Sequence, residues 1–442
     1  MRLLALLFAP LAAIAAAKPN VILILADDFG YECVTANGGQ SYKTPHLDRL
    51  AAAGIRFEQC HVQPICTATR VQLMTGRYNI RNYLDFGTLI RTETTFGQLF
   101  KKAGYATGIC GKWQLGREAD APQHFGFDEA LLWQHTRLTP RYANPGLELN
   151  GVAKEYPPGS YGPKLINDFA LDFITRHKEA PFFLYYPMIL AHAPYQPTPD
   201  SPGWDPTAKG EGKQQTRNFA DMVSYLDKMV GRLDAKLDEL GIRENTLLLF
   251  IGDNGTGRDV TSRFDGADYR GGKGTTTARG YHVPFIASWP GAIKQGRVSR
   301  DLISSTDFLP TICAAAGIPV SAGVDGVSFL PQLRGEKGAP REWLYSWYSP
   351  RQSNDMSISE FAFTQDAKLY RTGTYFDLRA DPDEKKPLKV AALTGSAADT
   401  AKQLQAVLAK FQDARPAELD KAFQQAIKGD AKAKQKNKGA GK

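Results

Sequence analysis

Five short apolar runs, spread along the first two thirds of the chain, constrain its fold most strongly. Each is six or seven residues long, and most consist of branched and aromatic residues without regular polar alternation. This pattern is typical of strands that are buried on both faces of a sheet. We expect strands at Val21–Ala26, Tyr105–Cys110, Pro181–Pro187, Thr246–Ile251 and Val283–Trp289.

Amphipathic stretches separate these runs. We expect helices at His46–Ala53, Thr94–Ala103, Lys164–Lys178, Thr216–Leu240 and Thr306–Ala315. Alternation of buried strands with amphipathic helices predicts the α/β class, with one large sheet sandwiched between helices.

Polar residues follow four of the five runs at the point where each run ends. They are Asp27 and Asp28, then Lys112, then His192, and finally Asp253 and Asn254. In open α/β sheets, ligands bind beyond the carboxyl ends of the strands. Each cluster alone is compatible with a turn or a helix cap. Four clusters at one topological position instead predict a common site.

The residue types in these clusters indicate the chemistry of that site. Carboxylate and amide oxygens are hard ligands, which favour Ca²⁺ or Mg²⁺ over zinc. A divalent cation together with Lys112, His192 and Arg70 makes a strongly positive pocket. Such a pocket suits a sulfate or phosphate ester, whose oxygens gain charge in the transition state.

A cysteine at an expected helix start is the candidate nucleophile. Cys66 opens the stretch CTATRVQLMTGR, so its side chain lies among free backbone N–H groups, which favour an anion. Arg70 lies one turn further along the same face. A buried cysteine with a surface arginine is the alternative interpretation of this pair. The chain has five cysteines, an odd number, so at least one has no intramolecular disulfide partner.

The two ends of the chain differ in composition from the rest. Residues 1–17 have a basic start, an apolar centre and a small-residue end, which predicts a signal peptide and an exported, periplasmic or secreted protein. Residues 428–442 contribute +5 of the net charge of +8 and are expected to be disordered. No later run is apolar and long enough for a membrane span. We expect no nucleic-acid partner.

A series of sequence blocks, in a specific order and spacing, covers nearly the whole remaining chain. In this order and spacing, the chain resembles the sulfatase family of the alkaline-phosphatase superfamily. The matching blocks are PNVILILADDFG, TPHLDRLAAAGIRFEQCHV, CTATRVQLMTGR, GYATGICGKWQLG, AHAPYQP, FIGDNG, RGGKGTTTARGYHVPFIASWPG, STDFLPTICAAAGIP and FDLRADPDE.

The resemblance implies a chemistry for each matched position. Cys66 would be converted to formylglycine by a maturation enzyme, and its hydrated aldehyde would attack sulfur. One Ca²⁺ would be bound by Asp27, Asp28, Cys66, Asp253 and Asn254. Arg70 and Lys112 would hold the gem-diol. Lys112, His192 and Lys273 would bind the sulfate, with His192 or Lys273 near the leaving oxygen.

Three positions depart from the family pattern. Ala68 replaces the usual proline of the cysteine block, which concerns the choice of maturation enzyme. Gln114 replaces the histidine of G-K-W-H-L-G, the supposed base for sulfate elimination, and a glutamine cannot accept a proton. Ala278 and His282 replace an acid and an arginine after Lys273, outside the expected set of reacting groups.

The part of the chain after about residue 335 has a different pattern. Short alternating runs and a closing helix at Ala397–Asp413 predict a smaller C-terminal domain, which the resemblance describes as a four-stranded antiparallel sheet with a helix. We expect domains at 18–335 and 336–427. The aromatic residues Trp343, Tyr345, Trp347 and Tyr348 are expected in its core. A long loop at Leu131–Tyr161 is expected to edge the cleft.

The sequence thus predicts an exported sulfatase that cleaves a sulfate ester. The expectation that the ester is on a carbohydrate comes from the predicted export and from the resemblance to the family. Two alternatives stay open. A phosphatase or phosphonate-ester hydrolase could use the same fold. The chain has only seven histidines, and no D-x-x-x-H motif lies near His192 or His282, which argues against zinc. The second alternative is a non-catalytic relative that binds anions or glycans, and it stays open because Gln114 replaces the supposed catalytic base.

Overall fold

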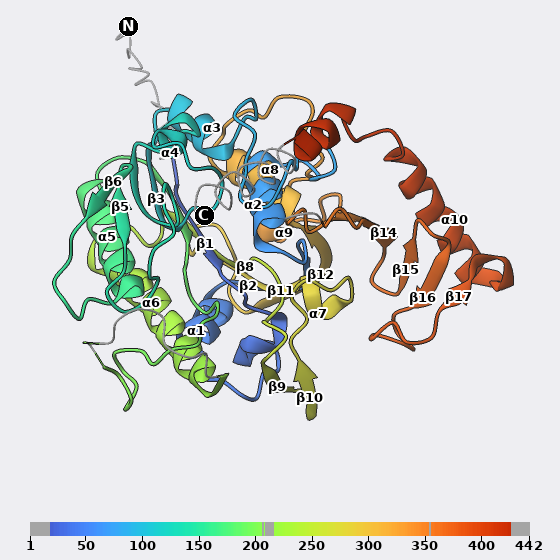
Figure 1. The fold of residues 1–442 in the computed structure, drawn as a ribbon, viewed down its shortest axis with the longest axis horizontal. Helices are drawn as coiled ribbons and strands as arrows, with labels where there is room; N and C mark the ends of the chain where they lie inside the picture. The colour runs from blue at the N-terminus through green and yellow to red at the C-terminus, as the bar shows by residue number, and fades with distance from the viewer. Residues whose placement is uncertain (1–17, 206, 208–215, 353–354, 426–442) are drawn as a thin grey trace, which may run out of the picture.

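The computed structural model describes residues 18–205, 207, 216–352 and 355–425. A mixed sheet of ten strands dominates it, in the order β12-β2-β11-β8-β1-β7-β3-β4-β5-β6 (Figure 1). Its strands are β1 (Asn20–Ala26), β2 (Ile55–His61), β3 (Ala106–Lys112), β4 (Glu129–Trp133), β5 (Leu147–Leu149), β6 (Val152–Lys154), β7 (Phe182–Pro187), β8 (Thr246–Gly252), β11 (His282–Ser288) and β12 (Arg297–Ser304).

Helices cover both faces of this sheet. The helices of this part of the chain are α1 (Pro45–Ala53), α2 (Cys66–Thr75), α3 (Phe96–Lys102), α4 (Ala121–His124), α5 (Gly162–Arg176), α6 (Phe219–Glu239), α7 (Ala278–Tyr281), α8 (Phe308–Ala315) and α9 (Leu330–Arg334). The last helix, α10 (Gly395–Lys410), packs instead against a second, smaller sheet. The predicted α/β sandwich and all five predicted strands are confirmed, each strand end to within two residues.

The central strand β1 shows why the sheet is apolar throughout. Val21, Leu23 and Leu25 pack into one core cluster with α2, α3 and α8. Ile22 and Ile24 point to the other face and pack with α1, α5 and α6. Successive side chains of a strand alternate between the faces, and here both faces are covered, so neither tolerates polar residues. Figure 1 shows these two helical layers on either side of the sheet.

Four neighbouring strands of the sheet run in parallel. β8, β1, β7 and β3 are adjacent, and each pair among them is parallel. Their carboxyl ends therefore lie at one edge of the sheet. β11 pairs antiparallel with both β8 and β2, which makes the sheet mixed.

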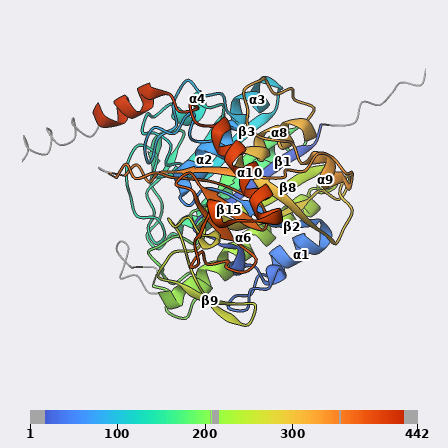
Figure 2. The ribbon, with the colours of Figure 1, turned by 90° about the vertical axis from the view of Figure 1, so that its right-hand side faces the viewer.

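A second, smaller sheet forms beyond the main one and is visible with α10 on the right of Figure 1 and facing the viewer in Figure 2. Its five strands are antiparallel and sequential, and a separate hairpin is formed by β9 and β10. These strands are β13 (Leu344–Tyr348), β14 (Ser359–Phe363), β15 (Ala367–Tyr370), β16 (Thr374–Asp377), β17 (Leu388–Lys389), β9 (Thr261–Phe264) and β10 (Ala267–Arg270). The predicted antiparallel sheet with a helix is confirmed, but it has five strands and not four, because two residues near 388 pair with β16.

Two further expectations are settled by the fold. Tyr345, Trp347 and Tyr348 are buried, and Trp343 packs partly buried against the same cluster, so these aromatic residues belong to the core. The segment Leu131–Tyr161 is not one loop, because it starts inside β4 and carries β5 and β6, which extend the main sheet. The expected signal peptide at 1–17 and the basic tail at 428–442 lie outside the described residues. None of the described helices combines the length and the apolar character that a bilayer crossing requires.

Candidate active site

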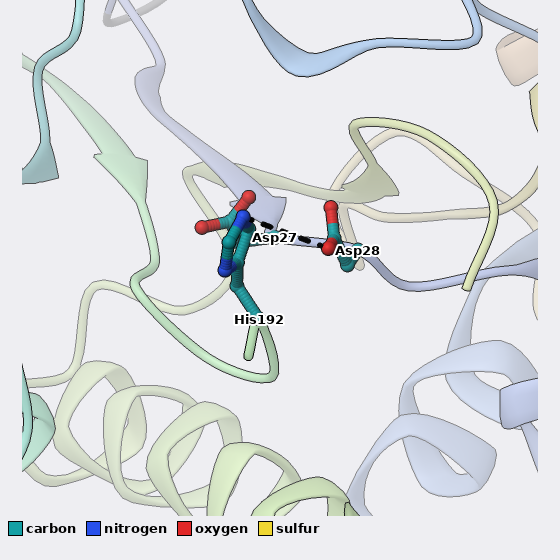
Figure 3. A group of neighbouring side chains, drawn as sticks. All are labelled: Asp27, Asp28 and His192. Carbon is teal, nitrogen blue, oxygen red and sulfur yellow. Dashed lines mark ion pairs between the residues drawn. The ribbon is translucent and has the colours of Figure 1, made fainter. Parts of the chain in front are cut away.

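All four polar clusters meet at the carboxyl edge of the parallel strands. Asp27 and Asp28 follow β1, Lys112 is the last residue of β3, and Asp253 follows β8. His192 follows β7 by a short loop whose backbone returns to β1, since Asp27 N donates to Leu190 O at 2.8 Å. The topology therefore brings together residues that are up to 226 positions apart. Figure 3 shows three of them, Asp27, Asp28 and His192.

Asp27 lies at the centre of a buried charge cluster. Lys112 Nζ donates to both of its oxygens, at 2.9 and 3.1 Å, and both side chains are fully buried. Arg141 Nη1 donates to Asp27 Oδ2 at 3.2 Å. Burial alone would raise the pKa of Asp27, but Lys112, His192 and Arg141 hold that pKa well below its ordinary value. Asp27 is therefore a carboxylate at neutral pH.

Asp28 connects the buried cluster with the more open side of the site. Lys273 Nζ lies 2.7 Å from Asp28 Oδ1 and 2.8 Å from Oδ2. His192 Nε2 lies 3.7 Å from Asp28 Oδ2 (Figure 3). The side chains of His192 and Lys273 are 25% and 23% exposed, so they lie where a ligand can reach them. Burial and the Arg141 guanidinium lower the pKa of His192 to about 3.

Asp253 and Asn254 complete the acidic group. Asp253 Oδ1 accepts from the backbone N–H of Asp28 at 2.9 Å. Burial and the nearby carboxylate of Asp27 raise the pKa of Asp253 to about 7. Asn254 Nδ2 donates to Asp28 Oδ1 at 2.8 Å. The Oδ1 atom of Asn254 is buried and has no hydrogen-bond partner among the described residues.

The donor set fits a hard divalent cation. Two overlapping groups have ligand atoms within 4.8 Å of one another: Asp27, Asp28 and His192, and Asp27, Cys66 and Asp253. Three carboxylates close together repel one another, and a divalent cation bound between them would relieve that repulsion. The unpartnered amide oxygen of Asn254 supplies a further hard donor, and buried polar atoms otherwise find a partner. Oxygen donors of this kind favour Ca²⁺ or Mg²⁺.

Cys66 is the first residue of α2 and faces this acidic group. Its thiol donates to Gln114 Oε1 at 3.0 Å, and Thr67 Oγ1 donates to the same oxygen at 3.3 Å. Gln114 follows β3 in the left-handed backbone region, with φ of 53°. The structure therefore brings the glutamine that replaces the family histidine into contact with the candidate nucleophile.

Arg70 lies one turn along α2 and is fully buried. Its Nη1 donates to Lys112 O at 3.1 Å, and its Nη2 donates to Asp253 Oδ2 at 3.2 Å. The alternative of a surface arginine is thus wrong. Within the described ranges no hydrogen bond joins Arg70 to the Cys66 thiol, so Arg70 links α2 to the ends of β3 and β8 instead.

Arg141 is the site residue that the sequence did not reveal. It lies between β4 and β5, and its guanidinium stacks 4.0 Å from the ring centroid of Trp133. Cation–π stacking fixes the group while it reaches Asp27. Arg141 is not part of a recognisable sequence motif. The one signal in the sequence was the expectation that the segment around it forms an edge of the cleft. His282, by contrast, hydrogen-bonds Glu58 O at 2.8 Å and stacks on Tyr31.

Comparisons with known proteins agree with this geometry. The sulfatase family profile matches residues 19–318, and a profile for the C-terminal part of N-sulphoglucosamine sulphohydrolase matches residues 275–414. Arylsulfatase A of Bos taurus is 33% identical over 411 residues, covering 83% of this chain and 78% of the relative. N-acetylgalactosamine-6-sulfatase of Mus musculus is 34% identical over 360 residues, covering 73% and 68%.

Solved structures have the same fold. The crystal structure of Ps i-CgsB aligns with a TM-score of 0.76 at 25% identity, covering 90% of this chain and 94% of that one. The complex of Ps i-CgsB with k-i-k-neocarrahexaose aligns equally well at 24% identity, with the same coverage, and shows the fold alone. The extent of the sequence matches decides the assignment: the chain belongs to the sulfatase family and is an enzyme that hydrolyses sulfate esters.

Proposed function

We propose that this protein is an exported sulfatase that removes sulfate from a carbohydrate, with a formylglycine made from Cys66 as its nucleophile and one bound Ca²⁺. The observation that carries the proposal is the position of Cys66. Its sulfur and the carboxylates of Asp27 and Asp253 have ligand atoms within 4.8 Å of one another. The side chains proposed as nucleophile and as metal ligands therefore lie close together, which supports the proposal.

The modification supplies what the residues cannot. A thiol gives no route for releasing sulfate after attack, whereas a hydrated aldehyde provides two hydroxyl groups, one to attack sulfur and one to expel the sulfate. Bound Ca²⁺ would supply positive charge next to the sulfate oxygens. The ligands proposed for it are Asp27, Asp28, Asp253, Asn254 and the modified residue 66.

The other side chains would bind and orient the ester. Lys273 and His192 lie on the open side of Asp28, so they would contact the sulfate and the leaving oxygen. Lys112 lies beneath them and is fully buried against Asp27, where its charge supports the negative transition state. Arg70 holds the start of α2 against β3 and β8 through its two hydrogen bonds.

The carbohydrate and the export are supported by different observations. The relative from Mus musculus is named for a sulfated sugar, N-acetylgalactosamine 6-sulfate, and the solved complex of Ps i-CgsB holds an oligosaccharide. Residues 1–17 have the composition of a signal peptide. Fractionation of producing cells should place the protein outside the cytoplasm, with Lys18 as its first residue.

Mass spectrometry and a substrate panel test the proposal together. The peptide that contains residue 66 should lose one sulfur and two hydrogens and gain one oxygen. The purified enzyme should hydrolyse 4-nitrophenyl sulfate and at least one sulfated sugar faster than 4-nitrophenyl phosphate or a phosphonate monoester. Active enzyme with an intact thiol at position 66, or a preference for the phosphorus esters, would contradict it.

A further inference from the structure

A cavity of about 530 Å³ lies directly beside the nucleophile and is not part of the charge cluster. It opens between the segment around residues 85–89, which follows α2, and the segments after β3 and β4. Gln114 forms part of its wall. Binding sites for small molecules have volumes of about 300 to 1,000 Å³, so this cavity is large enough for a ligand group.

The cavity is coupled to the nucleophile through a short chain of hydrogen bonds. Gly87, in the cavity wall, donates its N–H to Thr67 Oγ1 at 3.2 Å. Thr67 Oγ1 donates to Gln114 Oε1 at 3.3 Å, and the Cys66 thiol donates to the same oxygen at 3.0 Å. One side chain, that of Gln114, therefore separates the cavity from residue 66.

The charges of the lining balance one another. Arg117 and Arg137 contribute two positive charges, while Asp85 and Glu118 contribute two negative ones. A cavity for a second sulfate or a carboxylate would carry an excess of positive charge, because an anion is desolvated only where cations replace its water. The lining offers donors and acceptors in similar number, which suits an uncharged group with many hydroxyls.

Apolar side chains at the same cavity complete the pattern. Phe86 is half-buried in the wall, and Leu138 is 73% exposed at the cavity, the highest value among the described large apolar residues given as exposed. Phe86 and Leu138 thus add an apolar surface to a lining that is otherwise polar. A sugar ring has one apolar C–H face and a rim of hydroxyls, so it matches a lining of this kind, whereas a steroid or an aryl group would find few apolar partners.

Arg117 is an exposed polar group of the lining. Its side chain makes no hydrogen bond and no ion pair within the described part of the chain. Arg137, by comparison, lies 3.5 Å from Glu148. An arginine without a partner presents five N–H donors to a ligand. Arg117 is therefore the residue that a bound sugar hydroxyl would engage first.

We propose that this cavity binds an unsulfated sugar unit that is joined to the sulfated one, so that the substrate is an oligosaccharide of at least two units. The inference rests on the proposed sulfatase function and adds the size of its substrate. The sulfated unit occupies the site at residue 66, and its neighbour occupies the cavity beyond Gln114.

Chain length is the first variable to measure. For each sulfated sugar that the enzyme cleaves, kcat/KM is compared between the monosaccharide and the disaccharides that extend it on either side, with 4-nitrophenyl sulfate as a sugar-free reference. We expect one of the disaccharides to exceed the monosaccharide by about tenfold or more, because a hydrogen bond to a charged group contributes about 1.5 to 3 kcal/mol.

Two variants then locate the extra affinity. Arg117→Ala and Leu138→Asn change exposed side chains, so both should fold. In each, KM for the disaccharide should rise about tenfold, and the loss should be at least several times larger than the loss on 4-nitrophenyl sulfate. Arg334→Ala is the matched control, since Arg334 is exposed at the end of α9 and does not line the cavity. The inactive Cys66→Ala protein should bind the disaccharide by calorimetry, more weakly when Arg117→Ala is added.

The outcomes separate the two proposals. The sugar site in the cavity is wrong, and the sulfatase function stands, in either of two cases. In the first, the enzyme cleaves 4-nitrophenyl sulfate but has the same kcat/KM for monosaccharides and disaccharides. In the second, Arg117→Ala lowers kcat/KM equally for all substrates and leaves the calorimetric affinity for the disaccharide unchanged. If no sulfate ester is cleaved by protein with a modified residue 66, the proposed function itself is wrong. Selective loss on the disaccharide in both variants supports the sugar site.

Discussion

The two sides of the active site are built in different ways. On one side, Asp27 is held by Lys112 and Arg141 in a fully buried ion cluster. On the other side, the Cys66 thiol meets the neutral amide of Gln114 through a single hydrogen bond. Removing one partner from a buried ion pair leaves an uncompensated charge, whereas replacing one neutral group by another does not. Substitutions on the charged side should therefore destabilise the fold, whereas substitutions on the neutral side should leave its stability nearly unchanged.

The largest expected effect on activity comes from the nucleophile on the neutral side. Cys66→Ala should abolish turnover, because no nucleophile remains, while the melting temperature stays within a few degrees of the parent. The measurement is sulfatase activity together with thermal unfolding. Cys66→Ser is the control for side-chain size. A large loss of stability in Cys66→Ala would break the comparison, since it would show that the neutral side also holds the fold together.

Removal of the cation is the next test. Exhaustive chelation should lower activity by about 10³-fold or more, because a bound cation contributes several kcal/mol of charge stabilisation. Addition of Ca²⁺ should restore it. Asp253→Ala should reproduce the loss without restoration. Activity that survives chelation in protein shown by elemental analysis to be metal-free would contradict the proposed metal site.

Loss of the buried lysine tests the charged side directly. Lys112→Met keeps the side-chain length but leaves Asp27 without its closest partner. We expect activity to fall by about 10²- to 10³-fold, as when other preorganised charges are removed. The free energy of unfolding should also fall, by about 3 to 5 kcal/mol. A Lys112→Met protein as stable as Cys66→Ala would show that the two sides do not differ as we infer.

Arg141 sharpens the comparison, because it belongs to the charged side but comes from a loop. Arg141→Ala should lower kcat/KM by about 10- to 100-fold, the range expected for a charge-assisted hydrogen bond. Arg141→Lys keeps the charge but loses the planar stacking on Trp133, so its kcat/KM should lie between those of the parent enzyme and Arg141→Ala. Equal activities of the Lys and Ala variants would mean that the stacked position, and not the charge alone, is what matters.

The smallest effect is expected at Gln114, and it has the opposite sign. Glutamine cannot accept the proton that sulfate release requires, so release should be slower than the cleavage step. We expect a burst of alcohol followed by slower turnover. Because a positioned base contributes about 10²- to 10⁴-fold in other enzymes, Gln114→His should raise steady-state turnover by about tenfold and leave the burst rate unchanged. Stopped-flow measurements without a burst, and a variant no faster than the parent, would refute this.

Local pattern was sufficient for much of the fold. The ends of the five predicted strands lie within two residues of the observed ones, because an unbroken apolar run can be satisfied only between two helical layers. The strand-end residues were predictable for a related reason. In a parallel sheet the carboxyl ends lie at one edge, so Asp27, Lys112 and Asp253 had to meet once their strands were identified.

The rest depended on contacts between distant segments. β5 and β6 are three residues each, too short for a periodic signal, and they form only because β4 offers a free edge. Arg141 reaches Asp27 because that extension and the Trp133 ring place it there, and no local pattern records either contact.

The sequence by itself therefore determined the five central strands of the sheet, the residue types at its carboxyl edge and the family. Only the tertiary structure decided that Gln114 contacts Cys66, that Arg141 joins the charge cluster and that a cavity lies beyond Gln114. The physical reason is range. A buried strand can be predicted from the pattern of neighbouring residues, whereas the position of a loop side chain depends on the distant surface against which it packs.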